Sequence, residues 1–144
     1  MTLAGSIKTV LYDNWNLSGD LTKTKIRFAE TGWFDAKYAG HPQIVVSDLA
    51  EPIGRYFGGS YQTYPRFLVN LWLQIPRGAK GTAEAQDIED MRYEVLRVIQ
   101  SKKNDVATFE PLVPLDVGTP RHELDREPRR LRYEITLLGA HTKP

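Results

Sequence analysis

Apolar and polar side chains alternate along residues 65–75, and this alternation predicts a β-strand. One face of the strand is wholly apolar and carries Phe67, Val69, Leu71, Leu73 and Ile75. The opposite face is mixed and carries Arg66, Leu68, Asn70, Trp72 and Gln74. A strand with one apolar and one half-apolar face is typical of the centre of a sheet that is covered on both sides. Pro76 has no amide hydrogen to donate, so we expect the strand to end before it.

The spacing of apolar residues changes to a helical period after Gly81. Thr82 can cap a helix, and Glu84 and Asp87 put negative charge in the first turn, where the helix dipole favours it. The apolar stripe of this helix consists of Ala85, Ile88, Met91, Val95, Val98 and Ile99. These features predict one long amphipathic helix that ends near Lys102, with a flexible connection before it at residues 77–81.

Other segments also have the periodicity of regular elements. Residues 6–15 place apolar side chains at helical spacing, and residues 25–31 and 130–139 alternate charged with apolar residues. Residues 43–47 form a short run rich in β-branched residues. We therefore predict a short N-terminal helix and three further strands. The apolar segment 106–117 contains Pro111 and Pro114, which confine it to an edge strand or an irregular path.

Residues 48–64 are predicted to form a long loop, because they contain Pro52, Gly54, Gly58 and Gly59. The segment is too aromatic for a plain linker, since it also contains Arg55, Tyr56, Phe57, Tyr61 and Tyr64. These side chains are expected either to project and contact another molecule or to fold back as a lid on the chain's own core. Residues 141–144 are expected to form a flexible tail.

Together these elements predict an α+β fold in a single domain, residues 1–144. We expect a mainly antiparallel sheet of four to five strands, with the long helix packed on one face and a short N-terminal helix. The chain has 19 basic and 18 acidic residues, and its net charge of +1 is not the clearly basic balance of a nucleic-acid-binding domain. No apolar run is long enough to span a membrane, and no signal peptide is recognisable, so we expect a soluble intracellular protein.

No catalytic constellation is recognisable in the sequence. The chain has no cysteine, and its three histidines match no metal-binding pattern of the HExxH kind. Residues 122–127 combine His122 with three carboxylates, and we interpret them as a charged, solvated turn rather than as a metal site. Gly78 and Gly81 precede a helix N-terminus, but the acidic first turn would repel a phosphate. We therefore expect no enzyme activity and no metal or cofactor site.

Basic residues are dispersed in the N-terminal part and concentrated near the last strand. The dispersed ones are Lys8, Lys23, Lys25, Arg27 and Lys37, and the concentrated ones are Arg126, Arg129, Arg130 and Arg132. Alternation puts Arg130 and Arg132 on one face of the strand. The simplest interpretation is a solvated strand face, whose arginines could pair with carboxylates across a subunit contact. In a ring, however, one repeated basic residue becomes a basic annulus, even though each subunit is almost neutral.

The order and length of these elements resemble the tail terminator and tail-completion (neck) proteins of tailed bacteriophages and related archaeal viruses. The resemblance covers residues 7–138, and residues 43–47, 55–59 and 65–73 and the helix after them contribute most to it. It implies a compact α+β subunit without a catalytic site that assembles into a homo-oligomeric ring, commonly a hexamer. Such a ring would cap the tail tube protein and contact the head-side connector or adaptor protein. DNA would pass through its lumen without sequence specificity.

The resemblance also implies roles for residues and a location. In that family long hairpin-like loops reach neighbouring subunits, so the candidate interface residues are Arg55, Tyr56, Phe57, Tyr61 and Tyr64. The candidates for a lumen or subunit-contact role are Arg126, Arg129, Arg130 and Arg132. The protein would lie in the virion, at the head–tail junction or in the tail, and in the host cytoplasm during assembly.

Other functions remain compatible with the sequence. A different virion component of related fold is one alternative, such as a head–tail adaptor, a minor capsid protein or a tail tube protein. A small ligand-binding domain that uses the aromatic loop as a lid, or a nucleic-acid-binding module, is another.

Overall fold

A computed structural model describes residues 3–38, 40–50, 53–57, 59–76, 82–102, 113–117, 121–123, 129–139 and 141–143. Within these ranges the helices are α1 (Leu3–Asp13) and α2 (Thr82–Lys102), with short 3-10 helices η1 (Gly19–Leu21), η2 (Lys23–Lys25) and η3 (Ala36–Tyr38). The strands are β1 (Arg27–Glu30), β2 (Gln43–Ala50), β3 (Ile53–Phe57), β4 (Ser60–Thr63), β5 (Arg66–Gln74), β6 (Val113–Val117), β7 (Arg121–Glu123), β8 (Arg130–Leu138) and β9 (His141–Lys143). The α+β class expected from the sequence is confirmed.

The main sheet has the strand order β1-β2-β5-β8-β6, and β7 also pairs with β8. β1 runs parallel to β2, whereas the other pairs of this sheet are antiparallel. β5 is central, because it pairs with β2 on one side and along its whole length with β8 on the other. Residues 113–117 form an edge strand, as their prolines predicted, and a register shift between Pro114 and Asp116 interrupts its pairing with β8.

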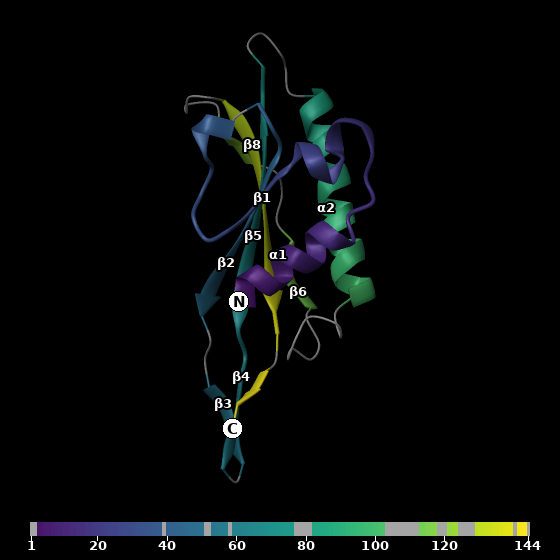
Figure 1. Ribbon diagram of the computed structural model, residues 1–144. Helices are drawn as coiled ribbons and strands as arrows, with labels where there is room; N and C mark the ends of the chain where they lie inside the picture. Colours follow the sequence, from purple (N-terminus) through teal and green to yellow (C-terminus); the bar gives the residue numbers. More distant parts are fainter. Residues whose placement is uncertain are drawn as a thin grey trace.

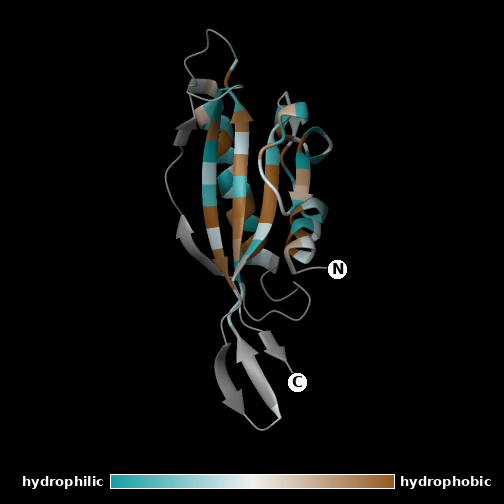
Figure 2. Cartoon of the chain, turned by 90° about the vertical axis from the view of Figure 1, so that its left-hand side faces the viewer, coloured by the Kyte–Doolittle hydropathy of each residue, from teal (hydrophilic) through white to brown (hydrophobic). Residues whose placement is uncertain are grey.

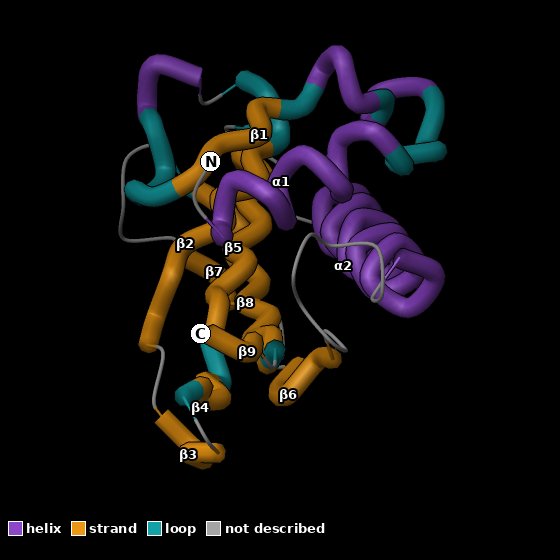
Figure 3. Tube along the Cα trace, turned by 60° about the horizontal axis from the view of Figure 1, so that its bottom comes forward, coloured by secondary structure: helices purple, strands orange, loops and turns teal. Residues whose placement is uncertain are grey.

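Both helices cover the same face of the main sheet, with α1 over β1 and β2, and α2 over β5 and β8 (Figure 1, Figure 3). The helices contribute Ala4, Ile7, Leu11, Ile88, Met91, Val95, Val98 and Ile99 to the core. The sheet contributes Ile44, Val46, Phe67, Val69, Leu71, Leu73, Leu131, Tyr133, Ile135 and Leu137. Bands of hydrophobic and hydrophilic residues follow the strands (Figure 2). In the described part of the chain, no helix has the length and apolar character needed to cross a bilayer.

A second, three-stranded sheet continues the middle of the main sheet, and we call its strands β3, β4 and β9 the extension. β3 follows β2, β4 precedes β5 and β9 follows β8, so the order β3-β4-β9 repeats the order β2-β5-β8. At the junction the amide of Gly139 donates a hydrogen bond to the carbonyl of Pro65 at 2.9 Å. The extension lies beyond the end of the main sheet and past both helices (Figure 1).

The extension corrects two expectations from the sequence. Residues 48–64 do not form a long loop, because they contain the end of β2 and the antiparallel hairpin of β3 and β4. Phe57 and Ser60 lie directly opposite each other, and in the sequence only two residues, both glycines, separate them. Residues 141–143 are not a loose tail, because they pair with β4 as β9 and so supply hydrogen-bond partners to its second edge. Similarly, His122 lies in β7, which pairs with β8, rather than in a turn.

Glu94 on α2 ties this helix to the chain that follows α1. Its side chain is 6% exposed. It accepts hydrogen bonds from Arg97 Nε at 2.7 Å and Nη2 at 2.8 Å, and from the amide of Asn16 at 2.5 Å. The hydrogen bonds from Arg97 and, to a lesser extent, from the Asn16 amide lower the pKa of Glu94 below its ordinary 4.5, although burial opposes the shift.

Replacing Glu94 by Gln is expected to lower the free energy of unfolding at neutral pH by about 1–3 kcal/mol, because the hydrogen bonds from Arg97 lose their charge assistance. The pKa of Glu94 is lower in the folded state, so the wild type has this stabilisation above pH 4.5 and loses it as the pH falls through the folded pKa. Urea unfolding over a pH series should therefore give a difference between wild type and variant that is largest at neutral pH and shrinks in acid.

The matched control is Asp13→Asn, which changes an exposed carboxylate at the end of α1 and should alter stability by less than about 0.5 kcal/mol. A difference between wild type and Glu94→Gln that is independent of pH would contradict the assigned role of the Glu94 charge.

Candidate functional site

The extension brings together four of the five aromatic-loop residues that the sequence singled out. Arg55, Tyr56 and Phe57 lie in β3, and Tyr61 lies in β4. In the register of the hairpin, Tyr56 is directly opposite Tyr61, Arg55 is opposite Gln62 and Phe57 is opposite Ser60. The four residues therefore lie at neighbouring positions of one hairpin.

The register of the extension continues on both sides of this pair. Ile53 pairs with Thr63, after a register shift between Ile53 and Arg55. On the other edge of β4, Lys143 of β9 lies opposite Tyr61. Tyr64 lies between β4 and β5 at the junction with the main sheet, where it is half-buried.

The basic residues of β8 do not form the open strip that the sequence suggested. Arg130 is only 6% exposed, and its guanidinium carbon lies 4.2 Å from the centre of the Phe34 ring. Arg132 is also largely buried: its Nε donates to Oδ1 of Asn70 at 3.1 Å, and it forms an ion pair with Glu134. The interpretation of a solvated strand face is therefore wrong for these two side chains, whereas a role in a lumen or in a subunit contact stays a prediction.

The structure shows less about the other two candidates of that group, Arg129 and Arg126. Arg129 is half-buried and accepts a backbone hydrogen bond from Ile75 at 2.9 Å. Arg126 lies outside the described residues.

The segment between β1 and β2, residues 31–42, is what covers the arginines. It starts with a tight turn at Thr31 and Gly32, whose φ angles are 57° and 104°. The segment then passes over the face of the sheet opposite the helices, where the Trp33 ring packs edge-on against the buried Trp72, with ring centres 5.0 Å apart. The Arg132 guanidinium lies 4.3 Å from the centre of the Trp33 ring. Trp33 itself stays 46% exposed, so the segment leaves a braced aromatic side chain at the surface.

Gln43, which is fully buried at the start of β2, holds this segment in place. Its Oε1 accepts hydrogen bonds from the amide of Asp35 at 2.9 Å and from Nη1 of Arg27 at 3.0 Å. Its Nε2 donates to the carbonyl of Asp35 at 2.9 Å. One side chain thus satisfies both backbone groups of Asp35, which explains why a polar residue occupies this position.

The features described so far are surfaces that a partner could contact. Among the residues that the structure describes, no three His, Asp or Glu side chains are grouped as metal ligands. What the described part offers instead is an aromatic extension, an exposed and braced tryptophan, and a groove beside β1. Comparison with protein-family models and with curated proteins finds no match for the chain.

Replacing Gln43 by Leu is expected to leave the Asp35 amide and carbonyl unpaired and to cost about 1–3 kcal/mol of stability. Hydrogen exchange measured by mass spectrometry should show faster exchange across residues 31–42 in this variant. The matched control is Gln74→Leu, which removes a half-buried glutamine from the same face of the sheet. Equal exchange in the two variants over residues 31–42 would show that Gln43 does not hold the segment.

Proposed function

We propose that this chain is a structural protein of a tailed virus that forms a closed ring at the head–tail junction. The ring caps the tail tube protein, joins it to the head-side connector or adaptor protein, and lets DNA pass through its lumen. The role is mechanical: subunits bury surface against one another and against their partners, and no catalytic step is involved.

The single observation that carries the proposal is the extension. Its three strands project beyond the main sheet and past both helices (Figure 1), and Tyr56 and Tyr61 pair directly within it. Three short strands that no helix covers have little core of their own. A neighbouring subunit that packs on the extension would stabilise it, which also accounts for aromatic residues in a segment so far from the core of its own chain.

The contact that we propose is head-to-tail, because the extension of one subunit meets a different surface of the next. A heterologous contact of this kind closes into a ring when a whole number of rotations from one subunit to the next makes one full turn. The exposed Trp33, braced by Arg132, is our candidate for the receiving surface. Tryptophan and arginine are enriched among the residues that contribute most of the binding energy of an interface.

Ring closure also explains how such a protein would stop growth of a tail tube. The two faces of a head-to-tail ring are different, so one can match the end of the tube while the other cannot accept another tube subunit. That second face is then available to the head-side connector or adaptor protein.

The double variant Tyr56→Ser/Tyr61→Ser is expected to weaken self-association by at least about tenfold, because it removes two aromatic side chains from the contact. Sedimentation velocity over a concentration series measures the effect, and a far-ultraviolet circular dichroism spectrum checks the fold. Tyr93→Ser is the matched control, since Tyr93 is 62% exposed on α2, away from the extension, and the variant should assemble like the wild type.

Negative-stain images of the wild type separate the alternatives. Closed rings are expected, whereas filaments would favour a tail tube protein instead. A wild type that stays monomeric at high concentration and does not bind isolated tail tubes would overturn the proposal.

A further inference from the structure

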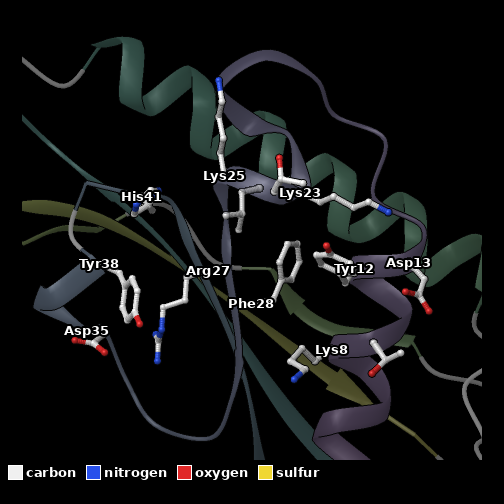
Figure 4. A pocket seen from close by; sticks show the side chains of 13 residues that line it. Lys8, Tyr12, Asp13, Lys23, Lys25, Arg27, Phe28, Asp35, Tyr38 and His41 are labelled. Atoms are coloured by element: carbon white, nitrogen blue, oxygen red, sulfur yellow. The ribbon is translucent and has the colours of Figure 1, made fainter.

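An open groove of about 960 Å³ lies beside β1, at the free edge of the main sheet. It is bounded by α1, by the segment around η2, by β1 itself and by the segment around η3 (Figure 4). The residues that line it are Lys8, Thr9, Tyr12, Asp13, Lys23, Thr24, Lys25, Ile26, Arg27, Phe28, Asp35, Tyr38 and His41.

The groove gathers basic residues that are dispersed in the sequence. Lys8, Lys23, Lys25 and Arg27 line it, against the two carboxylates of Asp13 and Asp35. The fold thus concentrates four of the five N-terminal basic residues on one surface, although the whole chain has a net charge of only +1. The fifth, Lys37, lies next to the groove, with Nζ 5.8 Å from the centre of the Tyr38 ring.

Two exposed tyrosines accompany these cations. Tyr12 is 39% exposed and Tyr38 is 40% exposed, and they lie on opposite sides of β1 (Figure 4). Lys23 Nζ lies 4.9 Å from the centre of the Tyr12 ring, and the guanidinium carbon of Arg27 lies 5.6 Å from the centre of the Tyr38 ring. Each side of the groove therefore presents a ring together with a cation, which is the combination that holds sugars or bases beside phosphates.

The cations are available to a ligand. Lys25 forms a solvent-exposed pair with Asp20 at 3.7 Å, and such pairs contribute little. The pair of Lys8 with Glu30 is partly exposed, and at 4.0 Å it is long. Among the residues that the structure describes, Lys23 has no carboxylate partner. Arg27 is held in position by Oε1 of Gln43 at 3.0 Å, so its guanidinium needs little ordering when an anion binds.

We propose that this groove binds the phosphate backbone of nucleic acid without sequence specificity. The surplus of cations selects a polyanion, and the tyrosines favour a nucleic-acid strand over an acidic peptide. Binding is a property of the groove alone, whereas its location on the inner wall of a ring rests on the proposed function. The inference also moves the basic surface from β8, where Arg130 and Arg132 are buried, to the flank of β1.

The test uses the full chain and short fluorescent oligonucleotides of mixed sequence, one single-stranded and one duplex, in anisotropy titrations at several salt concentrations. The variant Lys8→Gln/Lys23→Gln/Lys25→Gln is expected to lose at least about tenfold in affinity at low salt. Its plot of log affinity against log salt should be shallower by about two to three, because up to three phosphate contacts are lost. Comparison of the two oligonucleotides shows whether the groove binds the backbone of a single strand or that of a duplex.

The matched control is Arg66→Gln/Lys102→Gln/Lys103→Gln, which lowers the net charge equally but changes no residue that lines the groove. This control should bind like the wild type. Equal losses in both triple variants would assign the binding to bulk charge and overturn the proposal. So would a wild type that binds neither oligonucleotide at low salt, or one from which an acidic polyglutamate peptide displaces the oligonucleotide as readily as unlabelled DNA does.

Sedimentation of the same samples keeps this inference separate from the ring. Rings that bind no oligonucleotide would overturn the groove proposal alone. A chain that binds through the groove but never assembles would support the groove and contradict the proposed function.

Discussion

The pairing of β5 with β2 on one side and β8 on the other is the constraint on which the rest of the structure depends. It fixes which side chains face the helices, because a shift of one residue would move the whole apolar set to the other face. It also fixes the strand order of the extension, since β3, β4 and β9 are continuations of these three strands in the same order. One register therefore positions both the core and the extension that lies beyond it.

The two faces of the main sheet are covered in different ways, and this difference decides which residues can contact partners. The helices bury the core-facing residues of β2, β5 and β8, whereas residues 31–42 cover part of the other face and are anchored through Gln43. This cover buries Arg130 and leaves Trp33 exposed. In the part of the chain that the structure describes, the surfaces open to binding include the extension, the surroundings of Trp33 and the groove beside β1.

Local periodicity predicted the long helix, the central strand and the last strand, because each of them buries one continuous stripe or face. It missed the hairpin in residues 48–64, because glycines are typical of loops, although Gly58-Gly59 between two short runs is also a hairpin signal. The burial of Arg130 and the gathering of lysines beside β1 could not be read from spacing. Both depend on which distant segment packs over a strand, and alternation indicates only which residues share a face.

The most direct test of the account is hydrogen exchange of the extension as a function of protein concentration. If a neighbouring subunit completes this small sheet, amides of residues 53–57 and 60–63 should become strongly protected as the chain assembles, while those of α2 and β5 change little. Protection of the extension that stays the same between dilute monomer and concentrated protein, even as the mass in solution rises, would contradict the claim that subunits meet through it.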